Sequence, residues 1–475
     1  MDAVQCDVAV LGMGTSGEDA ALRLAGAGLH VVGIEANLIG GECPYWACLP
    51  TKSLVRSANL VAEARRADGL VGTVTVDPNW TIIAERIRAE ITGGWDDSGG
   101  VSRFEAKGGT FVRGMGRLIG PRAIQVGDAT IRARIGILVA TGSTPSVPPI
   151  DGLRDLPFWT NHEAIASEHL PKQLVVLGGG AVGCELAQVF ARFGSQVAII
   201  EGADRILAHG EPEASGVVAD ALVDDGVRII TSHHARSVAG DEETVSVTLD
   251  DGTVVTGSNL LVATGRRADA DAIGASAADA VVERGRIVVD GRMRAADGLW
   301  AMGDVTGVGM LTSVAEYQAR IAVEDILGAE PRPADYTANP TVTFTDPEVG
   351  SVGLTEAAAR EAGFELEVQV KDIQATFRGW LHRTGNTGVI KLVVDASSRT
   401  LVGATIVGPS ASEAIAFLSL AVSKQMTVDD LVNEIYAFPT FVGGIGESVG
   451  AYGRGIARVL DPATPPLMDD PPSSR

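Results

Sequence analysis

The chain has 475 residues, of which 45% are hydrophobic and 21% are charged, and its formal net charge at pH 7 is −22. This length is sufficient for two or three domains, each with its own core. The strong negative charge argues against nucleic acid and anionic membranes as partners, because neutralising phosphates requires basic patches. The sequence shows neither an apolar run long enough to span a bilayer nor a signal peptide, so we expect a cytoplasmic protein. Four cysteines in so long a chain do not form a disulfide scaffold.

The first predicted module is a strand, a glycine-rich turn, a helix and a second strand that ends in an acid. Residues 6–11 have a buried-strand pattern and run into three glycines, Gly12, Gly14 and Gly17. A helical stretch follows, and the strand predicted at 29–34 ends at Glu35. The glycines provide a tight turn, a close approach of backbone to pyrophosphate, and close packing of helix on strand. Phosphates would lie at the helix N-terminus, and Glu35 would accept from ribose hydroxyls unless it is a solvated strand end.

The next stretch, residues 40–52, reads Gly-Gly-Glu-Cys-Pro-Tyr-Trp-Ala-Cys-Leu-Pro-Thr-Lys and contains Cys43 and Cys48. On an ideal helix five residues rise about 7.5 Å, which exceeds the ~7 Å that a disulfide allows between Cα atoms. A bond therefore requires a distorted first turn, which Pro44 favours. A helix starting here, together with Lys52, would favour a thiolate. We favour a redox dithiol over two small buried hydrophobes, and over a zinc site, for which no further Cys or His lies near.

The same module returns later in the chain. A strand at 173–177, a helix at 184–193 and a strand at 196–200 surround three glycines and lead to an acid: Gly178, Gly180, Gly183 and Glu201. The first glycine and the acid are 23 positions apart in both modules. Chance glycine clusters do not reproduce a whole unit at equal spacing, so the repeat predicts two dinucleotide-binding domains.

Each module closes with an apolar strand that runs into a Thr-Gly pair: Thr141-Gly142 and Thr264-Gly265. Such a pair is compatible with a chain that passes close to a nucleotide. Residues 143–149 contain three prolines and are interpreted as a linker. Further on, a strand predicted at 299–302 leads into Asp304. This aspartate is a candidate acceptor for a cofactor hydroxyl, and the alternative is a cap of the helix expected at 311–326.

From about residue 340 the pattern changes to mixed helices and strands without a third nucleotide fingerprint. We predict strands at 342–344, 366–370, 388–394 and 401–407, and helices at 356–362 and 412–423. Residues 461–475 are rich in proline and acid and are expected to be disordered. The predicted fold class is α/β, with two Rossmann-like dinucleotide-binding domains and an α+β C-terminal domain. Cys6 and Cys184 are expected to pack in the core.

These motifs together resemble the pyridine nucleotide-disulfide oxidoreductases, the family of dihydrolipoyl dehydrogenase, glutathione reductase and mercuric reductase. The resemblance extends from Val4 to about Val459, and residues 40–52 are its most specific part. It implies FAD on the first module, a nicotinamide nucleotide on the second, and a C-terminal domain that pairs two subunits. The implied divisions are FAD binding at 1–150 and 267–336, NAD(P) binding at 151–266, dimerisation at 337–460 and a tail at 461–475.

The resemblance also implies the site residues. FAD is assigned to Gly12, Gly14, Gly17, Glu35, Lys52, Gly116, Thr141, Gly142 and Asp304. The second fingerprint assigns the nicotinamide nucleotide to Gly178, Gly180, Gly183, Glu201 and Gly265. NADH is expected over NADPH because Glu201 would repel a 2′-phosphate, although Arg205 nearby would favour it. The implied catalytic residues are Cys48 facing the flavin, Cys43 facing the substrate, and Lys52 paired with Glu185; no metal ligands are predicted.

The resemblance breaks near the C-terminus. Disulfide reductases of this family carry a His-Pro-Thr motif followed, three residues after the Thr, by a Glu, and the second subunit supplies the His as acid and base. Here Phe438 stands at the His position and Gly443 at the Glu position. A phenyl ring cannot shuttle a proton, and Tyr436 is a poor substitute because a phenol titrates near 10. Mercuric reductases also lack that His, but they use a C-terminal cysteine pair, and no cysteine follows Cys184 here.

The sequence therefore predicts a homodimeric FAD enzyme that accepts hydride from NAD(P)H. Electrons would leave through Cys43 and Cys48, or directly from the flavin, for a small-molecule acceptor. Because Phe438 replaces the His, we favour a quinone or metal ion as acceptor, with the cysteine pair as relay or ligand. The alternatives are a disulfide reductase of the dihydrolipoyl dehydrogenase or glutathione reductase type, and a low-turnover, flavin-bound partner subunit.

Overall fold

The computed structural model describes residues 4–241 and 243–450. The chain divides into two compact units, the first with residues 1–54, 79–170 and 260–336, the second with 55–78, 171–259 and 337–475. The tail predicted at 461–475, and the end of the family resemblance near Val459, lie outside the described residues. Among the helices of the described ranges, none combines the length and the apolar character needed to cross a membrane.

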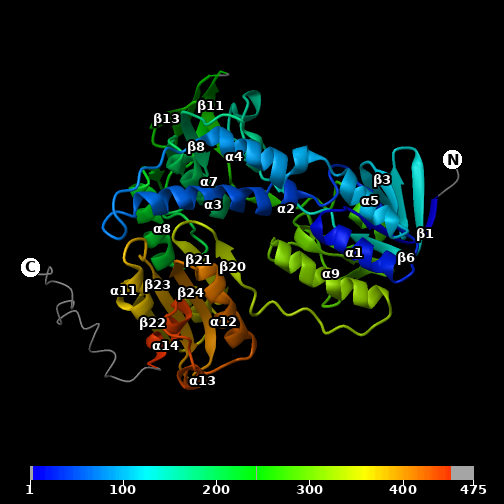
Figure 1. Ribbon diagram of the computed structural model, residues 1–475. Coiled ribbons are helices and arrows are strands. Elements are labelled where there is room, and N and C mark those ends of the chain that lie inside the picture. Colours follow the sequence, from blue (N-terminus) through cyan, green and yellow to red (C-terminus); the bar gives the residue numbers. More distant parts are fainter. Residues whose placement is uncertain (1–3, 242, 451–475) are drawn as a thin grey trace, which may run out of the picture. The chain divides into compact units, whose positions relative to one another are not determined.

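The first unit is built on a mainly parallel sheet, of which Figure 1 labels β1, β3 and β6. The strand order of this sheet is β18–β19–β6–β1–β2–β3. Its strands are β1 (Val4–Leu11), β2 (Val31–Glu35), β3 (Thr110–Arg113), β6 (Ala129–Val139), β18 (Arg294–Ala296) and β19 (Leu299–Ala301). Only β18 runs antiparallel to its neighbour on this path, and an antiparallel pair, β4 (Gly116–Gly120) and β5 (Ala123–Val126), joins β6. The predicted strands at 6–11, 29–34 and 299–302 are confirmed.

Both faces of this sheet are buried. Helices α1 (Thr15–Gly26), α5 (Ser98–Ala106) and α9 (Thr312–Ile326) pack against one face, where Val8 and Val10 of β1 lie. The alternate β1 residues Ala9 and Leu11 point to the other face and pack with β4, β5 and the segment around 270–287. A strand covered on both sides is continuously apolar, which explains the unbroken hydrophobic run at residues 8–11 of β1.

Several short elements complete the first unit. They are α2 (Glu42–Tyr45), the start of α3 (Cys48–Arg65), α4 (Trp80–Arg86), a π-helical turn (Ile87–Ile91), α6 (Asn161–Ala166), β7 (Thr144–Pro145) and β15 (Arg266–Arg267). The proline-rich stretch predicted as a linker contains β7, which pairs antiparallel with β15. Next to this pairing, the Ser146 N–H donates to the Gly265 carbonyl at 2.9 Å, and the Thr264 hydroxyl donates to the Ser146 carbonyl at 2.7 Å.

The second dinucleotide-binding module lies in the second unit. Its parallel strands follow the order β10 (Arg228–Ile230), β9 (Gln196–Ile200) and β8 (Gln173–Leu177), with helices α7 (Ala181–Arg192) and α8 (Pro212–Asp224). A separate antiparallel sheet contains β11 (Ala235–Gly240), β12 (Val245–Leu249) and β13 (Val254–Gly257). Strand β14 (Asn259–Val262) lies at the boundary between the units. The repeat predicted from glycine spacing is therefore a repeat of structure.

The rest of the second unit is an α+β domain around an antiparallel sheet. The strand order is β20 (Thr341–Thr343), β21 (Glu348–Gly353), β24 (Leu401–Gly408), β23 (Val389–Asp395) and β22 (Leu366–Asp372). Its helices are α10 (Glu356–Glu361), α11 (Phe377–His382), α12 (Ala411–Ser423), α13 (Val428–Asn433) and α14 (Phe441–Val449). Strand β21 escaped prediction because its glycines weaken the strand pattern. At Gly350 a side chain would press on Ala411 and Ile415, so packing of α12 requires the glycine.

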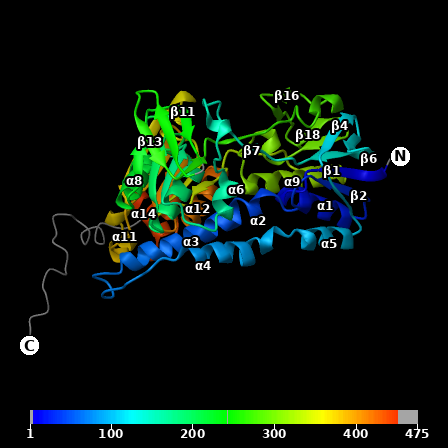
Figure 2. The ribbon, with the colours of Figure 1, turned by 90° about the horizontal axis from the view of Figure 1, so that it is seen from above.

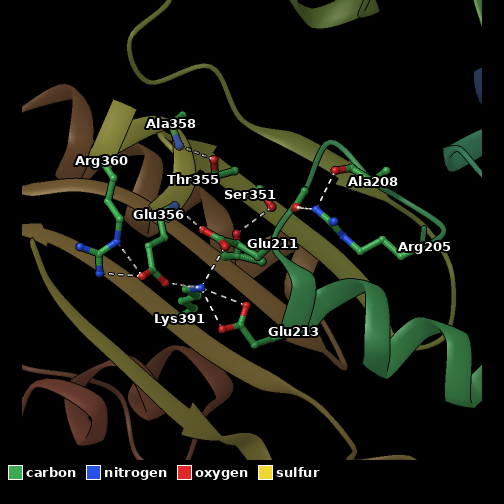
Figure 3. Close-up of polar contacts among 12 residues, drawn as sticks. Arg205, Ala208, Glu211, Glu213, Ser351, Thr355, Glu356, Ala358, Arg360 and Lys391 are labelled. Atoms are coloured by element: carbon green, nitrogen blue, oxygen red, sulfur yellow. Dashed lines mark hydrogen bonds and ion pairs between the residues drawn. The ribbon is translucent and has the colours of Figure 1, made fainter. Parts of the chain in front are cut away.

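A buried charged cluster joins the second module to this sheet. The ammonium group of Lys391 on β23 lies 2.9 Å from Glu211, 2.8 Å from Glu213 and 2.9 Å from Glu356 (Figure 3). The Lys391 side chain is only 2% exposed. Burial alone would lower the pKa of Lys391, but its hydrogen bonds to the three carboxylates outweigh burial and raise the pKa above its usual value. The charged lysine therefore holds the start of α8 against the C-terminal sheet.

We expect Lys391→Met to lower the stability of the second unit. The change leaves the buried carboxylate of Glu211 without its cation, and breaking a buried pair in this way costs about 3–5 kcal/mol. The melting temperature of the whole protein should fall by roughly 10 °C in a thermal scan. Lys424→Met, at an exposed lysine of the same domain, is the control. Equal melting temperatures for the two variants would contradict the stabilising role of Lys391.

Candidate functional site

The three glycines of the first fingerprint occupy three different environments. Gly12 has φ +94°, and a side chain there would clash with the backbone of Ala140. A side chain at Gly17 would clash with the Gly12 carbonyl, so α1 packs closely on the turn. Gly14 faces open space, with no atom within 4 Å of a Cβ placed there. The turn thus has a tight bend, a close helix contact and one open backbone position.

The second fingerprint repeats this arrangement. Gly178 has φ +105°. A side chain at Gly183 would clash with the Gly178 carbonyl, and Gly180 faces open space. In both modules the open glycine is the N-cap of the following helix, α1 or α7. Each open position therefore lies where the exposed N–H groups of a helix N-terminus attract phosphate.

The acids that end the second strand of each module are also held alike. Glu35 accepts hydrogen bonds from the backbone N–H of Met13 at 2.7 Å and of Asn37 at 2.8 Å. Glu201 accepts from the N–H of Gly179 at 2.6 Å and of Ala203 at 2.8 Å. Neither acid is simply a solvated strand end, because backbone donors of its own module orient it beside the glycine turn.

Apart from Lys52 on α3, the remaining residues assigned to FAD lie at the same edge of the first sheet. Gly116 packs against the last part of β1 and β2, at Leu11 and Ile34. Thr141 and Gly142 follow β6, and Asp304 follows β19. The carboxyl ends of parallel strands are where open α/β sheets bind ligands. With the open turn at Gly14, this arrangement fits a dinucleotide such as FAD.

Asp304 is part of a polar chain rather than a helix cap. It accepts a hydrogen bond from the hydroxyl of Ser143. Arg266 donates to the Ser143 hydroxyl at 2.8 Å and to its carbonyl at 2.7 Å. The N-cap of α9 is Leu311 and receives no side-chain hydrogen bond. The alternative that Asp304 caps this helix is therefore wrong.

The dithiol lies where the backbone changes from one helix to another. Helix α2 ends at Tyr45, Trp46 leaves the helical region with φ −134° and ψ −6°, and α3 begins at Cys48. The distorted turn that the spacing requires is therefore confirmed. Cys43 and Cys48 are free thiols joined by a hydrogen bond, whereas the buried Cys6 and Cys184 lie in the core, as predicted.

The two thiols are electrostatically unequal. The hydrogen bond from Cys43, with smaller contributions from the Thr312 hydroxyl and Lys52, outweighs burial and lowers the pKa of Cys48 to about 6. The same bond, together with burial, raises the pKa of Cys43 above its usual value. At neutral pH Cys48 is therefore the thiolate and Cys43 the protonated thiol.

Thr312 was not identified from the sequence. It is the first residue of α9, and its Oγ1 lies 3.3 Å from the Cys48 Sγ although the two residues are 264 positions apart. The available signal in the sequence was a hydroxyl residue at the start of the helix that follows Asp304. Without the fold, nothing relates that position to the dithiol.

The other predicted catalytic residues are distributed over both units. Lys52 lies four residues after Cys48 on α3, in the first unit. Glu185 is buried on α7 in the second unit, and its Oε1 accepts from the N–H of Phe344 at 2.9 Å. The pairing of Lys52 with Glu185 stays a prediction. Gly265 precedes β15 with φ +102° and faces open space.

The position expected for the His carries an exposed aromatic ring. Phe438 is 56% exposed, and its ring meets that of Phe377 edge-on with centroids 5.1 Å apart. The hydroxyl of Tyr436 donates to the carbonyl of Leu431. The backbone N–H of Gly443 donates to Thr440, which caps α14. The side chains of Phe438 and Gly443 thus offer no proton carrier.

Comparisons with known proteins agree with this geometry. The family model described as pyridine nucleotide-disulphide oxidoreductase matches residues 6–319, and that of its dimerisation domain matches residues 339–449. A dihydrolipoyl dehydrogenase from Chlorobaculum tepidum is 35% identical, covering 94% of this chain and 97% of the relative. A mercuric reductase from Streptomyces lividans is 30% identical, covering 95% and 97%.

A solved structure has the same fold. The Cu(II) complex of the HOCl-induced flavoprotein disulfide reductase RclA from Escherichia coli superposes with a TM-score of 0.84. Its sequence is 27% identical, and the match covers 95% of this chain and 99% of that chain. The predicted fold class, two Rossmann-like domains followed by an α+β dimerisation domain, is confirmed.

We expect Thr312→Val to weaken the Cys48 thiolate. In the reduced protein the thiolate should be present at neutral pH and be lost as the pH falls through about 6. Removing the hydroxyl donor should move this midpoint upward by roughly one pH unit, since a hydrogen bond to a charged group contributes ~1.5–3 kcal/mol. Thiolate absorbance of the anaerobically reduced protein, measured against pH, checks this. Ser313→Ala, at the exposed neighbour, should leave the midpoint unchanged, and an unchanged midpoint in Thr312→Val would contradict the assignment.

Proposed function

The chain belongs to the pyridine nucleotide-disulphide oxidoreductase family, whose members are FAD-dependent enzymes, and on this premise we propose that its acceptor is not a disulfide. Electrons from NAD(P)H would pass by way of Cys43 and Cys48 to a quinone or a metal ion. When bound, FAD supplies the two-electron chemistry between the nicotinamide and the dithiol. The observation that carries the proposal is Phe438, an exposed phenyl ring where a disulfide reductase needs an acid and base.

The proposed roles of the site residues are those that the family resemblance implies. The open glycine turns hold the phosphates of the two nucleotides, FAD in the first module and the return segment 267–336, NAD(H) in residues 151–266. Cys48 is the thiolate on the flavin side, and Cys43 is the thiol that meets the acceptor. Lys52, paired with Glu185, stabilises the negative charge that arrives with the hydride. The dimerisation domain supports a homodimer.

Known relatives support a metal ion as one class of acceptor. One relative is a mercuric reductase, and the RclA structure is a Cu(II) complex. An acceptor that takes electrons without a proton needs no imidazole at the position of Phe438. An apolar ring there also favours a flat or apolar acceptor such as a quinone.

The second candidate is a disulfide reductase, which the 35% identity to a dihydrolipoyl dehydrogenase favours. In that case the acid and base work would come from the substrate, water or another residue. A low-turnover partner subunit has less support, because both nucleotide-binding glycine turns and an unequal thiol pair are present, and these features suit a redox enzyme.

The geometry around Glu201 supports NADH as the donor. Its carboxylate lies at the strand end, where the ribose 2′-hydroxyl of a bound nucleotide is expected. Arg205, the residue that would favour NADPH, donates instead to the carbonyls of Ala208 at 2.8 Å and Gly210 at 3.2 Å. Because the Arg205 guanidinium already donates hydrogen bonds to its own loop, it would bind a 2′-phosphate less strongly.

We expect slow turnover of small disulfides. General acid–base help contributes typically about 10²–10⁴-fold, so lipoamide and glutathione disulfide should be reduced far more slowly than by an efficient enzyme. Quinones and metal ions should be less affected. Phe438→His should raise the disulfide rate and leave the quinone rate nearly unchanged. Steady-state rates with NADH and each acceptor check this.

The matched control for that change is Phe438→Leu, which alters the ring without adding a titratable group. It should leave the disulfide rate low. If the unmodified protein reduces lipoamide or glutathione disulfide at hundreds of turnovers per second in order of magnitude, the proposal is wrong and the second candidate stands.

We further expect NADH to be the more efficient donor. Glu201→Gln removes the charge that repels a 2′-phosphate, so the ratio of kcat/KM for NADPH to that for NADH should rise about tenfold. The equivalent change in the first module, Glu35→Gln, is the control and should leave this ratio unchanged. A clear NADPH advantage in the unmodified protein would show that Arg205 decides the preference.

A further inference from the structure

The turn that carries Cys43 has little stability of its own. Helix α2 contains four residues, and its N-cap, Gly41, makes no side-chain capping hydrogen bond. So short a helix is unstable in isolation, because fixing the first turn costs more than its few hydrogen bonds return. The position of Cys43 therefore depends on contacts from other parts of the first unit.

Helix α6 lies near α2 (Figure 2), and its side chains contact both ends of the turn. The Nε2 of His162 lies 2.6 Å from a carboxylate oxygen of Glu42, the first residue of α2. The side-chain amide of Asn161 donates to the other oxygen of Glu42 at 3.1 Å and to the carbonyl of Trp46 at 2.7 Å. Asn161 is 9% exposed, so these bonds are largely shielded from water.

The ring of His162 makes a second contact with the turn. The imidazole stacks on the indole of Trp46, with centroids 4.6 Å apart and planes 12° from parallel. The other partner of Trp46 is Trp95, stacked at 5.2 Å. One side chain thus contacts the residue before Cys43 and the residue at the helix break after it.

Helix α6, which carries His162, is itself held in place. Thr160 and Glu163 form a capping box at the start of α6. The preceding residue, Trp159, exchanges backbone hydrogen bonds with Leu260 and Val262. Arg266 approaches Glu42 at 3.4 Å from a third segment. His162 therefore extends from a well-anchored helix, α6, toward α2, which is not stable by itself.

We propose that His162 is a positioning residue for the dithiol, holding α2 so that Cys43 meets Cys48. If the turn relaxed toward a continuous helix, five residues of helical rise would separate the Cα atoms by about 7.5 Å, beyond disulfide range. The bond to Glu42 and the stack on Trp46 resist that change. This inference rests on the proposed redox role of Cys43 and Cys48.

The measurable consequence is the position of the dithiol–disulfide equilibrium. Forming the S–S bond removes two electrons and two protons from the two thiols, and in the test oxidised dithiothreitol takes up both. Loss of His162 should lower the effective concentration of one thiol near the other. We expect His162→Ala to shift the equilibrium about tenfold toward the dithiol, about 30 mV for a two-electron couple.

The experiment equilibrates the holoprotein in buffers of oxidised and reduced dithiothreitol and counts alkylated Cys43 and Cys48 by mass spectrometry. His162→Phe keeps a ring to stack on Trp46 but loses the donor, and His162→Gln keeps a donor toward Glu42 but loses the stack. Each should therefore shift the equilibrium toward the dithiol, but less than His162→Ala does. His169→Ala, at an exposed histidine of the same segment, should match the wild type.

Two failures are distinguishable. If the wild type forms the disulfide and both His162→Ala and His162→Phe titrate like it, the positioning role is wrong and the proposed function stands. If the wild type forms no disulfide between Cys43 and Cys48, the proposed redox function fails, and this inference fails with it. Should His162→Ala not fold, the shifts of His162→Phe and His162→Gln from the wild-type value decide the same question.

Discussion

A disulfide can close between residues five apart only where the helix between them is interrupted, and the candidate site depends on that interruption. Here the break falls at Trp46, between α2 and α3. It brings Cys43 to Cys48 while α3 still begins at Cys48, so the thiolate lies at a helix N-terminus. The contacts from α6 and the stacked rings around Trp46 all act on this one turn.

The same geometry makes the two sulfurs different. In the hydrogen bond between them, the thiol of Cys43 donates to the sulfur of Cys48. This bond stabilises negative charge on Cys48 and keeps the proton on Cys43. The Thr312 hydroxyl and the Lys52 charge further lower the pKa of Cys48. A thiol that retains its proton needs a base before it attacks a disulfide, and Phe438 is not one. The proposed transfer to a quinone or a metal ion rests on this difference.

The two nucleotide modules show how far backbone geometry can be repeated in one chain. Each has a glycine at positive φ, an open glycine and a packed glycine, and each orients its acid with two backbone N–H groups. Their surroundings differ. The second module is joined to the C-terminal sheet through the buried ammonium of Lys391, which three carboxylates surround. Similar local turns are thus built into different tertiary contexts.

The sequence by itself determined the features that depend on local spacing. Glycine turns, strand-end acids, the cysteine pair and the need for a distorted turn are properties of neighbouring residues, and the fold class followed from their repetition. Only the tertiary structure decided which distant side chains meet them. Thr312 reaches Cys48 across 264 positions and His162 reaches Glu42 across 120, because sheet order and helix packing bring those segments together. Hydrophobic periodicity specifies which face of an element is buried, but not which polar residue of another element will lie opposite it.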